Sequence, residues 1–136
     1  MTRVDSSVGA VIPVHLNCQS VDMIEINELV RDSGTKIIED ASHALGSRFA
    51  LPDGTIESVG SCSHSDMCVF SFHAVKTIAM GEGGAVTTKT TEYADRLRLL
   101  RNHGILDQPG EFSNTETAFD NNGEVNPWYY EMHEPG

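Results

Sequence analysis

The fold is decided by a short run of sequence, Lys36-Ile37-Ile38-Glu39-Asp40. Its apolar middle is typical of a strand that lies inside a parallel sheet. The run closes in two acids, and the carboxyl ends of parallel strands are where open α/β sheets place their functional sites. We therefore expect residues 36–40 to form a parallel strand with Asp40 at the mouth of a site.

A strand and a helix are predicted before this run. Residues 10–16 are apolar and rich in β-branched side chains, which favours a strand that Pro13 weakens at one edge. From about Asp22 to Asp32 the apolar positions recur at helical spacing, and Ser33-Gly34 supplies a stop. A strand, a covering helix and a parallel strand form one unit, so the predicted fold class is α/β.

Further elements are predicted after this unit. Pro52-Asp53-Gly54 indicates a tight turn, as at the tip of a small hairpin. Residues 67–72 and 84–88 have the pattern of buried strands, and the glycine-rich residues 81–84 form a turn between them. A lysine, Lys76, lies in the loop between these two strands.

One more helix and a long irregular segment complete the chain. Thr90 or Thr91 can cap a helix that ends at Gly104. We expect its apolar positions to bury one side; they are Ala94, Leu97, Leu99 and Leu100. Residues 105–136 show no sustained periodicity, are acidic and contain no Lys or Arg, which is typical of a solvated acidic loop.

Composition limits the classes of function. With 39% apolar and 21% charged residues the chain is typical of a soluble globular protein. A net charge of −11 repels nucleic acid and anionic membrane surfaces, so neither is an expected partner. Three cysteines without zinc spacing favour a reduced, cytoplasmic location and no metal site. No apolar stretch is long enough for a membrane span or a signal peptide.

The chemistry is indicated by three segments taken together, residues 39–46, 70–76 and 81–86. They place an acid at a strand end, a lysine just after a strand, and then a glycine turn, as pyridoxal-phosphate (PLP) chemistry of the aminotransferase kind requires. A lysine nucleophile must lose its proton near neutral pH, which desolvation or nearby positive charge promotes. Taken alone, Lys76 is a solvated loop lysine and Asp40 an N-cap for a helix from Ala41.

Other polar residues near these segments are weaker candidates. Ser71 supplies a hydroxyl at a strand end, where a phosphate can also meet backbone N–H groups. His43 and His73 can hydrogen-bond or stack near a cofactor ring, although isolated histidines are more often packing residues. Glu82 is equally well a solvated turn residue.

These motifs resemble the DegT/DnrJ/StrS nucleotide-sugar aminotransferases over roughly residues 11–136. The similar runs are Ser71-Phe72-His73-Ala74-Val75-Lys76, Gly81-Glu82-Gly83-Gly84-Ala85-Val86, Leu100-Arg101-Asn102-His103-Gly104 and Pro127-Trp128-Tyr129-Tyr130-Glu131-Met132. Within the family they are most similar to the branch of pseudaminic-acid pathway transaminases. The resemblance implies the PLP-binding large domain of the aspartate aminotransferase fold (fold type I), incomplete at both ends. Residues 1–104 would be its central part and residues 105–136 a truncated acidic connection.

The resemblance also implies roles for single residues. Lys76 is implied as the catalytic Schiff-base lysine, and Asp40 as the partner of the cofactor's pyridinium nitrogen. Ser71 is implied as a phosphate contact, His43 as a contact near the ring hydroxyl, and His73 as a weaker cofactor contact. The cofactor that the resemblance implies is pyridoxal 5'-phosphate.

The implied reaction moves an amino group from glutamate to C4 of a UDP-linked 4-keto-6-deoxy N-acetyl sugar. Relatives with histidine in place of the lysine perform dehydration, which Lys76 argues against. A homodimer is implied for the full-length enzyme, and the isolated chain is expected to bind PLP weakly and to show little activity. One rival hypothesis is a non-catalytic α/β remnant or interaction module. Another, a nucleotide-binding module, lacks a Gly-x-Gly-x-x-Gly or Walker-type loop after a strand.

Overall fold

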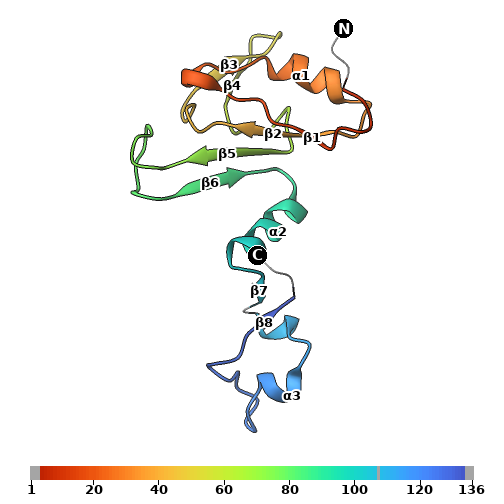
Figure 1. Ribbon diagram of the computed structural model, residues 1–136, viewed down its shortest axis with the longest axis vertical. Coiled ribbons are helices and arrows are strands. Elements are labelled where there is room, and N and C mark those ends of the chain that lie inside the picture. The colour runs from red at the N-terminus through yellow and green to blue at the C-terminus, as the bar shows by residue number, and fades with distance from the viewer. Residues whose placement is uncertain (1–3, 107, 134–136) are drawn as a thin grey trace. The chain divides into compact units, whose positions relative to one another are not determined.

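The computed structural model, which describes residues 4–106 and 108–133, places four strands in its main sheet, in the order β1-β2-β5-β6 (Figure 1). These strands are Ala10–Val11 (β1), Lys36–Asp40 (β2), Met67–Ser71 (β5) and Gly84–Thr87 (β6). β1, β2 and β5 run parallel, whereas β6 returns antiparallel to β5. The predicted α/β class is confirmed, and β2 has the predicted bounds.

The strand predicted for residues 10–16 is shorter than expected. After Val11 only Val14 makes a further parallel bridge, to Asp40, because Pro13 has no N–H to donate. The chain then turns into a 3-10 helix, η1 (Leu16–Cys18), where Asn17 and Cys18 both have left-handed φ, 54° and 64°.

The helix between β1 and β2 forms as predicted. α1 spans Met23–Val30, and the Asp22 carboxylate accepts N–H bonds from Ile24 and Glu25 at 3.1 and 3.0 Å. These bonds satisfy two of the amide groups that a helix start leaves without partners. The left-handed turn after the helix is supplied by Gly34 at a φ of 75°.

One face of the main sheet is covered and carries the core. Alternate residues of a strand point to the same face, so Ile37 and Glu39 of β2 point inward together. Ile37 packs with Met23 and Val30 of α1. Cys68 and Phe70 of β5 pack against the segment between β2 and β5. α1 and this segment therefore cover the same face.

The segment between β2 and β5 contains the predicted hairpin. Its strands are Arg48–Ala50 (β3) and Ile56–Ser58 (β4), and Pro52-Asp53-Gly54 lies at the turn. The predicted strands at residues 67–72 and 84–88 are confirmed as β5 and β6, each one residue shorter at its end.

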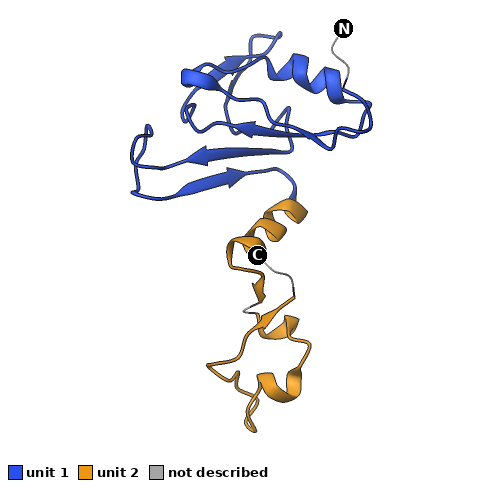
Figure 2. Cartoon of the chain, in the orientation of Figure 1, with its two compact units in different colours: residues 1–90 blue, residues 91–136 orange. Residues whose placement is uncertain are grey.

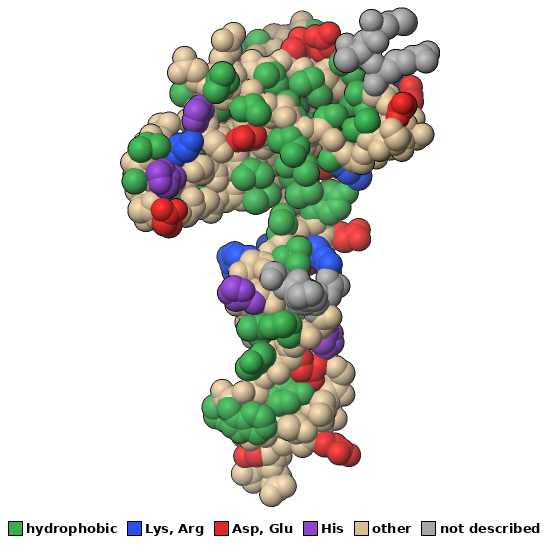
Figure 3. Space-filling model, viewed as in Figure 1, with side chains coloured by type: hydrophobic (Ala, Val, Ile, Leu, Met, Phe, Trp, Pro, Cys, Tyr) green, Lys and Arg blue, Asp and Glu red, His purple; other side chains and the backbone are tan. Residues whose placement is uncertain are grey.

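The opposite face of the sheet is apolar and open among the described residues. Val69 and Val86 are cross-strand partners, 36% and 41% exposed. Ile12 and Val14 are also exposed. Figure 3 shows hydrophobic side chains gathered over the middle of the part of the chain that contains the main sheet.

Figure 2 divides the chain into two compact units, residues 1–90 and 91–136. In the second unit, α2 (Thr91–Arg101) begins at the predicted cap and ends three residues before Gly104, which has a φ of 71°. The expectation that α2 buries one side is wrong: none of its residues is buried, and Leu100 is exposed. The following elements of this unit are short and cover little of the helix.

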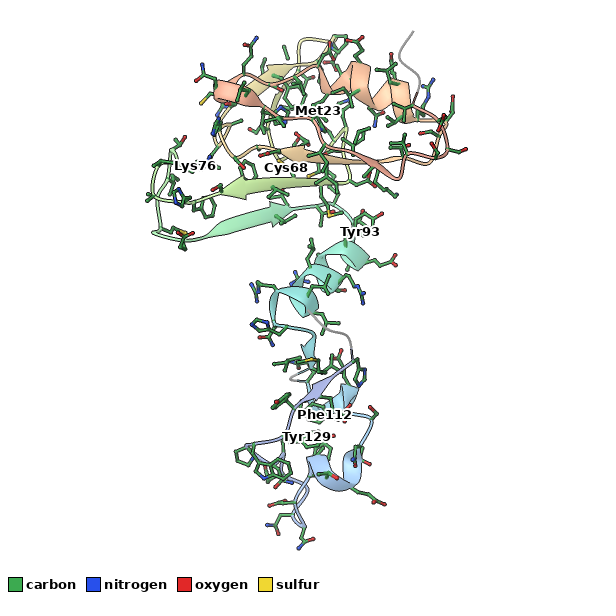
Figure 4. All side chains as sticks on the ribbon, viewed as in Figure 1. Met23, Cys68, Lys76, Tyr93, Phe112 and Tyr129 are labelled. Atoms are coloured by element: carbon green, nitrogen blue, oxygen red, sulfur yellow. The ribbon has the colours of Figure 1, made fainter. Side chains whose placement is uncertain are left out.

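Short elements follow α2, in a segment where no helix or strand was predicted. They are β7 (Ile105–Leu106), η2 (Pro109–Glu111), α3 (Thr115–Ala118) and β8 (Glu131–Met132), with β7 and β8 antiparallel. The buried Phe112 ring contacts Tyr129 edge-on at 5.1 Å between centroids (Figure 4). No helix in residues 4–106 or 108–133 is long and apolar enough to cross a membrane.

Candidate functional site

The candidate site lies at the carboxyl ends of β2 and β5. Asp40 is the last residue of β2 and lies beside Val69 of β5. Ser71 ends β5 two residues further on, so it shares a face with Val69 and Asp40. Both polar side chains are half-buried on the open apolar face of the sheet.

The Asp40 side chain is held in a tight turn. Its Oδ1 accepts the Ser42 N–H at 3.0 Å, and no helix begins at Ala41, so the simple N-cap alternative does not apply. The Ser42 hydrogen bonds lower the pKa of the Asp40 carboxyl, and the nearby charges of Lys76 and His43 lower it further. Asp40 is therefore an ionised carboxylate at neutral pH.

Lys76 lies in the loop that joins β5 to β6 (Figure 4). This loop is closed at its base because Phe72 N–H donates to Gly83 O and Met80 N–H donates to Phe72 O, both at 2.8 Å. A turn within it is closed by the Lys76 N–H, which donates to His73 O at 2.9 Å. The lysine is half-buried and close enough to Asp40 for its charge to act on the carboxylate.

The two histidines take different positions. His43 is exposed but close enough to Asp40 to affect it electrostatically, and its carbonyl accepts the Cys18 thiol at 2.7 Å. His73 N–H donates to Ser71 Oγ at 3.3 Å. The exposed His73 ring lies 3.8 Å from the Glu82 carboxylate, and so it is directed along the loop.

The structure thus brings Asp40, His43 and Lys76 into electrostatic range, and it joins Ser71 to His73 by a hydrogen bond. Figure 3 shows basic and histidine side chains together at one end of the first unit, residues 1–90. The roles of these residues toward a cofactor stay predictions.

The sequence analysis missed a buried polar chain behind Asp40. His15 Nε2 and Glu39 Oε2 are 2.7 Å apart, and the Ser65 hydroxyl donates to the other oxygen of Glu39. The available signal was the strand alternation, since Glu39 shares the inward face of β2 with Ile37.

A hollow also lies away from the candidate site residues. It measures about 1080 Å³ in the second unit, and Arg98, Leu99 and Glu111 are among the residues that line it. It contains none of the candidate site residues, so size alone does not identify the site.

Comparison with known proteins gives the family. Residues 2–124 match the model of the DegT/DnrJ/EryC1/StrS aminotransferase family. The chain belongs to the DegT/DnrJ/EryC1/StrS aminotransferase family. The resemblance expected from the sequence is thereby confirmed.

Two relatives illustrate the likeness. The spore coat polysaccharide biosynthesis protein SpsC of Bacillus subtilis is 36% identical over 127 residues, which are 93% of this chain and 28% of SpsC. The UDP-4-amino-4,6-dideoxy-N-acetyl-beta-L-altrosamine transaminase of Campylobacter jejuni is 39% identical over 106 residues, 78% of this chain and 26% of that enzyme. The chain thus spans less than a third of the length of these relatives.

Solved sugar aminotransferases share the fold. PseC of Helicobacter pylori, an aminotransferase of pseudaminic acid biosynthesis, matches with a TM-score of 0.68 and 27% identity, over 92% of this chain and 27% of PseC. DesI, solved with its TDP-sugar product, matches with a TM-score of 0.65 and 36% identity, over 79% of this chain and 25% of DesI. The architecture is therefore part of the fold type I domain of this family.

Proposed function

We propose that this chain carries the cofactor lysine and the pyridinium-facing carboxylate of a PLP-dependent nucleotide-sugar aminotransferase. The observation that carries the proposal is the placement of Asp40 at the carboxyl end of β2 and of Lys76 in the loop after β5, close enough for the lysine charge to act on the carboxylate. Membership of an aminotransferase family supports it. Bound PLP supplies an electron sink for the carbanion formed when the amino-bearing carbon loses its proton.

The residues present fit this cofactor. Asp40 is an ionised carboxylate, as is needed to hold a proton on the ring nitrogen of PLP. Lys76 provides an amine on a loop closed at its base, which would bond to the cofactor's aldehyde carbon as the aldehyde oxygen leaves as water. An unbonded Lys76 Nζ at this position would be able to take up and return the proton of the amino-bearing carbon.

Ser71 is proposed as a phosphate contact. Its Oγ accepts the His73 amide proton, so its own hydroxyl proton can be donated to a phosphate oxygen. His43 is proposed as a contact near the ring hydroxyl because it is close enough to Asp40 to act on its carboxylate electrostatically. His73 is the weaker cofactor contact, since its ring is directed toward Glu82.

The proposed substrates are glutamate as amino donor and a UDP-linked 4-keto-6-deoxy N-acetyl sugar, aminated at C4. The altrosamine transaminase and PseC relatives support this choice. The homodimer implied by the resemblance and the cytoplasmic location expected from the cysteines belong to the same proposal. Activity is followed as 2-oxoglutarate formed in the presence of the sugar, with Lys76→Ala as the inactive control.

Reductive trapping on the 136-residue chain tests the central claim. The chain is mixed with PLP, borohydride makes any lysine–PLP bond permanent, and mass spectrometry locates the modified lysine. Trapping detects even weak binding, because each bond that forms is retained. The other lysines, Lys36 and Lys89, are exposed and serve as internal controls. We expect Lys76 to be modified several-fold more than either.

Equal modification of all three lysines would contradict the proposal, because it would mean that PLP reacts only with accessible amines. That outcome would favour a non-catalytic α/β module. Lys76→Ala should remove the preferred adduct and leave modification of Lys36 and Lys89 unchanged.

A further inference from the structure

From the buried chain behind the site we infer that His15 is a positioning residue, which fixes the end of β2 that carries Asp40. Its side chain is fully buried, 0% exposed, although it follows a short edge strand. It is not a core residue in the apolar sense, because both ring nitrogens have polar partners.

The backbone around His15 is hydrogen-bonded directly to the backbone of Asp40. The His15 N–H donates to Asp40 O at 3.0 Å, and the Asp40 N–H donates to Pro13 O at 2.9 Å. Both main-chain groups of Asp40 are therefore bonded to one short segment. Displacement of that segment would displace the origin of the Asp40 side chain.

The His15 ring fixes this segment in turn. The Val21 N–H donates to Nδ1 at 3.2 Å, so Nδ1 acts as an acceptor and the ring proton is on Nε2. Nε2 then donates to Glu39 Oε2 at 2.7 Å. The geometry assigns a neutral imidazole in one tautomer, connecting the start of α1 to β2.

Glu39 gives this anchor its strength. It is 3% exposed and points to the covered face, opposite to its neighbour Asp40. Its carboxylate accepts from His15 and from the Ser65 hydroxyl. A buried carboxylate that loses a donor is strongly destabilised, so the His15 ring cannot move away without cost.

The consequence for catalysis rests on the proposed function. A misplacement of about 1 Å in a catalytic group can reduce a rate roughly a hundredfold. The contacts on the covered face of β2 thus fix the Asp40 carboxylate on the open face, and the His15 ring acts from a fully buried position. His15 is thus expected to affect the position of Asp40 more than its chemistry.

Nitrogen NMR on the unliganded chain tests the inference without PLP. In the wild type, the ¹⁵N shifts of the His15 ring at neutral pH should show a neutral imidazole protonated at Nε2. A ring protonated at Nδ1, or at both nitrogens, would overturn the inference, because Nδ1 could not then accept from Val21.

Substitutions test the effect on Asp40. The reporters are the Ser42 amide, which is bonded to Asp40 Oδ1, and hydrogen exchange of the Asp40 amide. His15→Leu removes the donor to Glu39, and His15→Gln retains one at a similar distance from the backbone. Val30→Ala serves as a control that weakens the core elsewhere in the same unit.

We expect His15→Leu to shift the Ser42 amide resonance and to speed Asp40 exchange by roughly tenfold relative to Val30→Ala. His15→Gln should restore both signals most of the way. Equal effects of His15→Leu and Val30→Ala would show a role in stability alone and would overturn the inference. If His15→Leu does not fold, two other measurements decide. They are the comparison of His15→Gln with the wild type and the tautomer of the His15 ring in the wild type. Because no cofactor is added, failure here is distinct from failure of the PLP proposal.

Discussion

At the scale of single residues, Asp40 and Asp53 form an instructive pair. Asp40 Oδ1 accepts the N–H of Ser42 at 3.0 Å, and Asp53 Oδ1 accepts the N–H of Thr55 at 2.9 Å. Both carboxyl groups have lowered pKa values because of these bonds. Only Asp40 also lies within range of Lys76. The local turn is therefore common to both, and the neighbouring charge is what distinguishes the candidate site.

This pair gives a matched prediction. Asp40→Asn keeps the turn but removes the charge, so PLP trapping on Lys76 should fall roughly tenfold or more, the loss expected for a hydrogen bond to a charged group. Asp53→Asn should leave trapping unchanged. The measurement is the yield of Lys76 adduct by mass spectrometry at fixed PLP. A similar yield in both variants would mean that Asp40 does not contact the cofactor.

At the scale of elements, the β5–β6 hairpin carries Lys76 and tolerates little change at its base. A Cβ on Gly84 would lie 2.7 Å from the backbone oxygen of Phe70, closer than real Cβ atoms come to such an atom. A Cβ on the neighbouring Gly83 would make only ordinary contacts, near 3.6 Å. Gly84 lies opposite Ser71 in the strand pair, so a clash there acts on the candidate site directly.

We therefore predict that Gly84→Ala destabilises the chain by about 1–3 kcal/mol, in the range of overpacking substitutions. Gly83→Ala should change the free energy of unfolding by less than half as much. Urea unfolding of both variants provides the measurement, and comparable losses would count against the close approach at Gly84.

Sequence reasoning predicted the elements where local signals agree with the tertiary structure. The run of residues 36–40 became β2 with the same bounds, because its alternation matches a strand between two parallel neighbours. Prediction from the sequence failed where tertiary contacts decide the local structure. The strand from Ala10 is interrupted after Val11, at Pro13, and beyond the single Val14 bridge it ends before the left-handed Asn17.

The candidate site was predictable only in part. Asp40 and Lys76 lie together because strand ends gather at one sheet edge, a rule that sequence can use. The His15–Glu39 contact joins positions 24 residues apart, and its tautomer depends on a Val21 amide that no local pattern reveals. Likewise, the apolar positions of α2 predicted burial, but burial requires a partner element that the second unit does not provide.

At the scale of the whole molecule, each compact unit has its own interior. The second unit is held around Glu131, whose carboxylate accepts from the Ser113 and Asn114 N–H groups at 2.9 and 2.8 Å. It also accepts from the Tyr129 hydroxyl at 2.5 Å, which raises the pKa of Tyr129 to about 12. These bonds, that of Asn114 foremost, hold the pKa of Glu131 well below its usual range.

The lowered pKa of Glu131 determines how the stability of the second unit depends on pH. A carboxyl whose pKa is lowered on folding adds stability above its unfolded value of 4.5, and that stability is lost as pH falls through the folded value. We predict that the second unit loses stability below about pH 4.5, as read by Trp128, the sole tryptophan of the chain. Glu131→Gln should lower its melting temperature at pH 7 and flatten this acid dependence.

Glu116→Gln, at an exposed position of the same unit, is the control and should leave the melting curve unchanged. The hydrogen-exchange rate of the Cys68 backbone amide, in the first unit, should be the same in Glu131→Gln and Glu116→Gln. An unchanged acid dependence in Glu131→Gln would locate the acid sensitivity in other carboxylates.

The closed base of the Lys76 loop limits how far the lysine amine can move. Because both stems of the loop belong to the sheet, the amine moves only as far as its own side chain and a short stretch of backbone allow. A tethered amine confined in this way meets a cofactor in the same site at an effective concentration far above that of any amine free in solution. In the proposed reaction, recapture after each turnover would therefore outcompete loss of the cofactor to solvent.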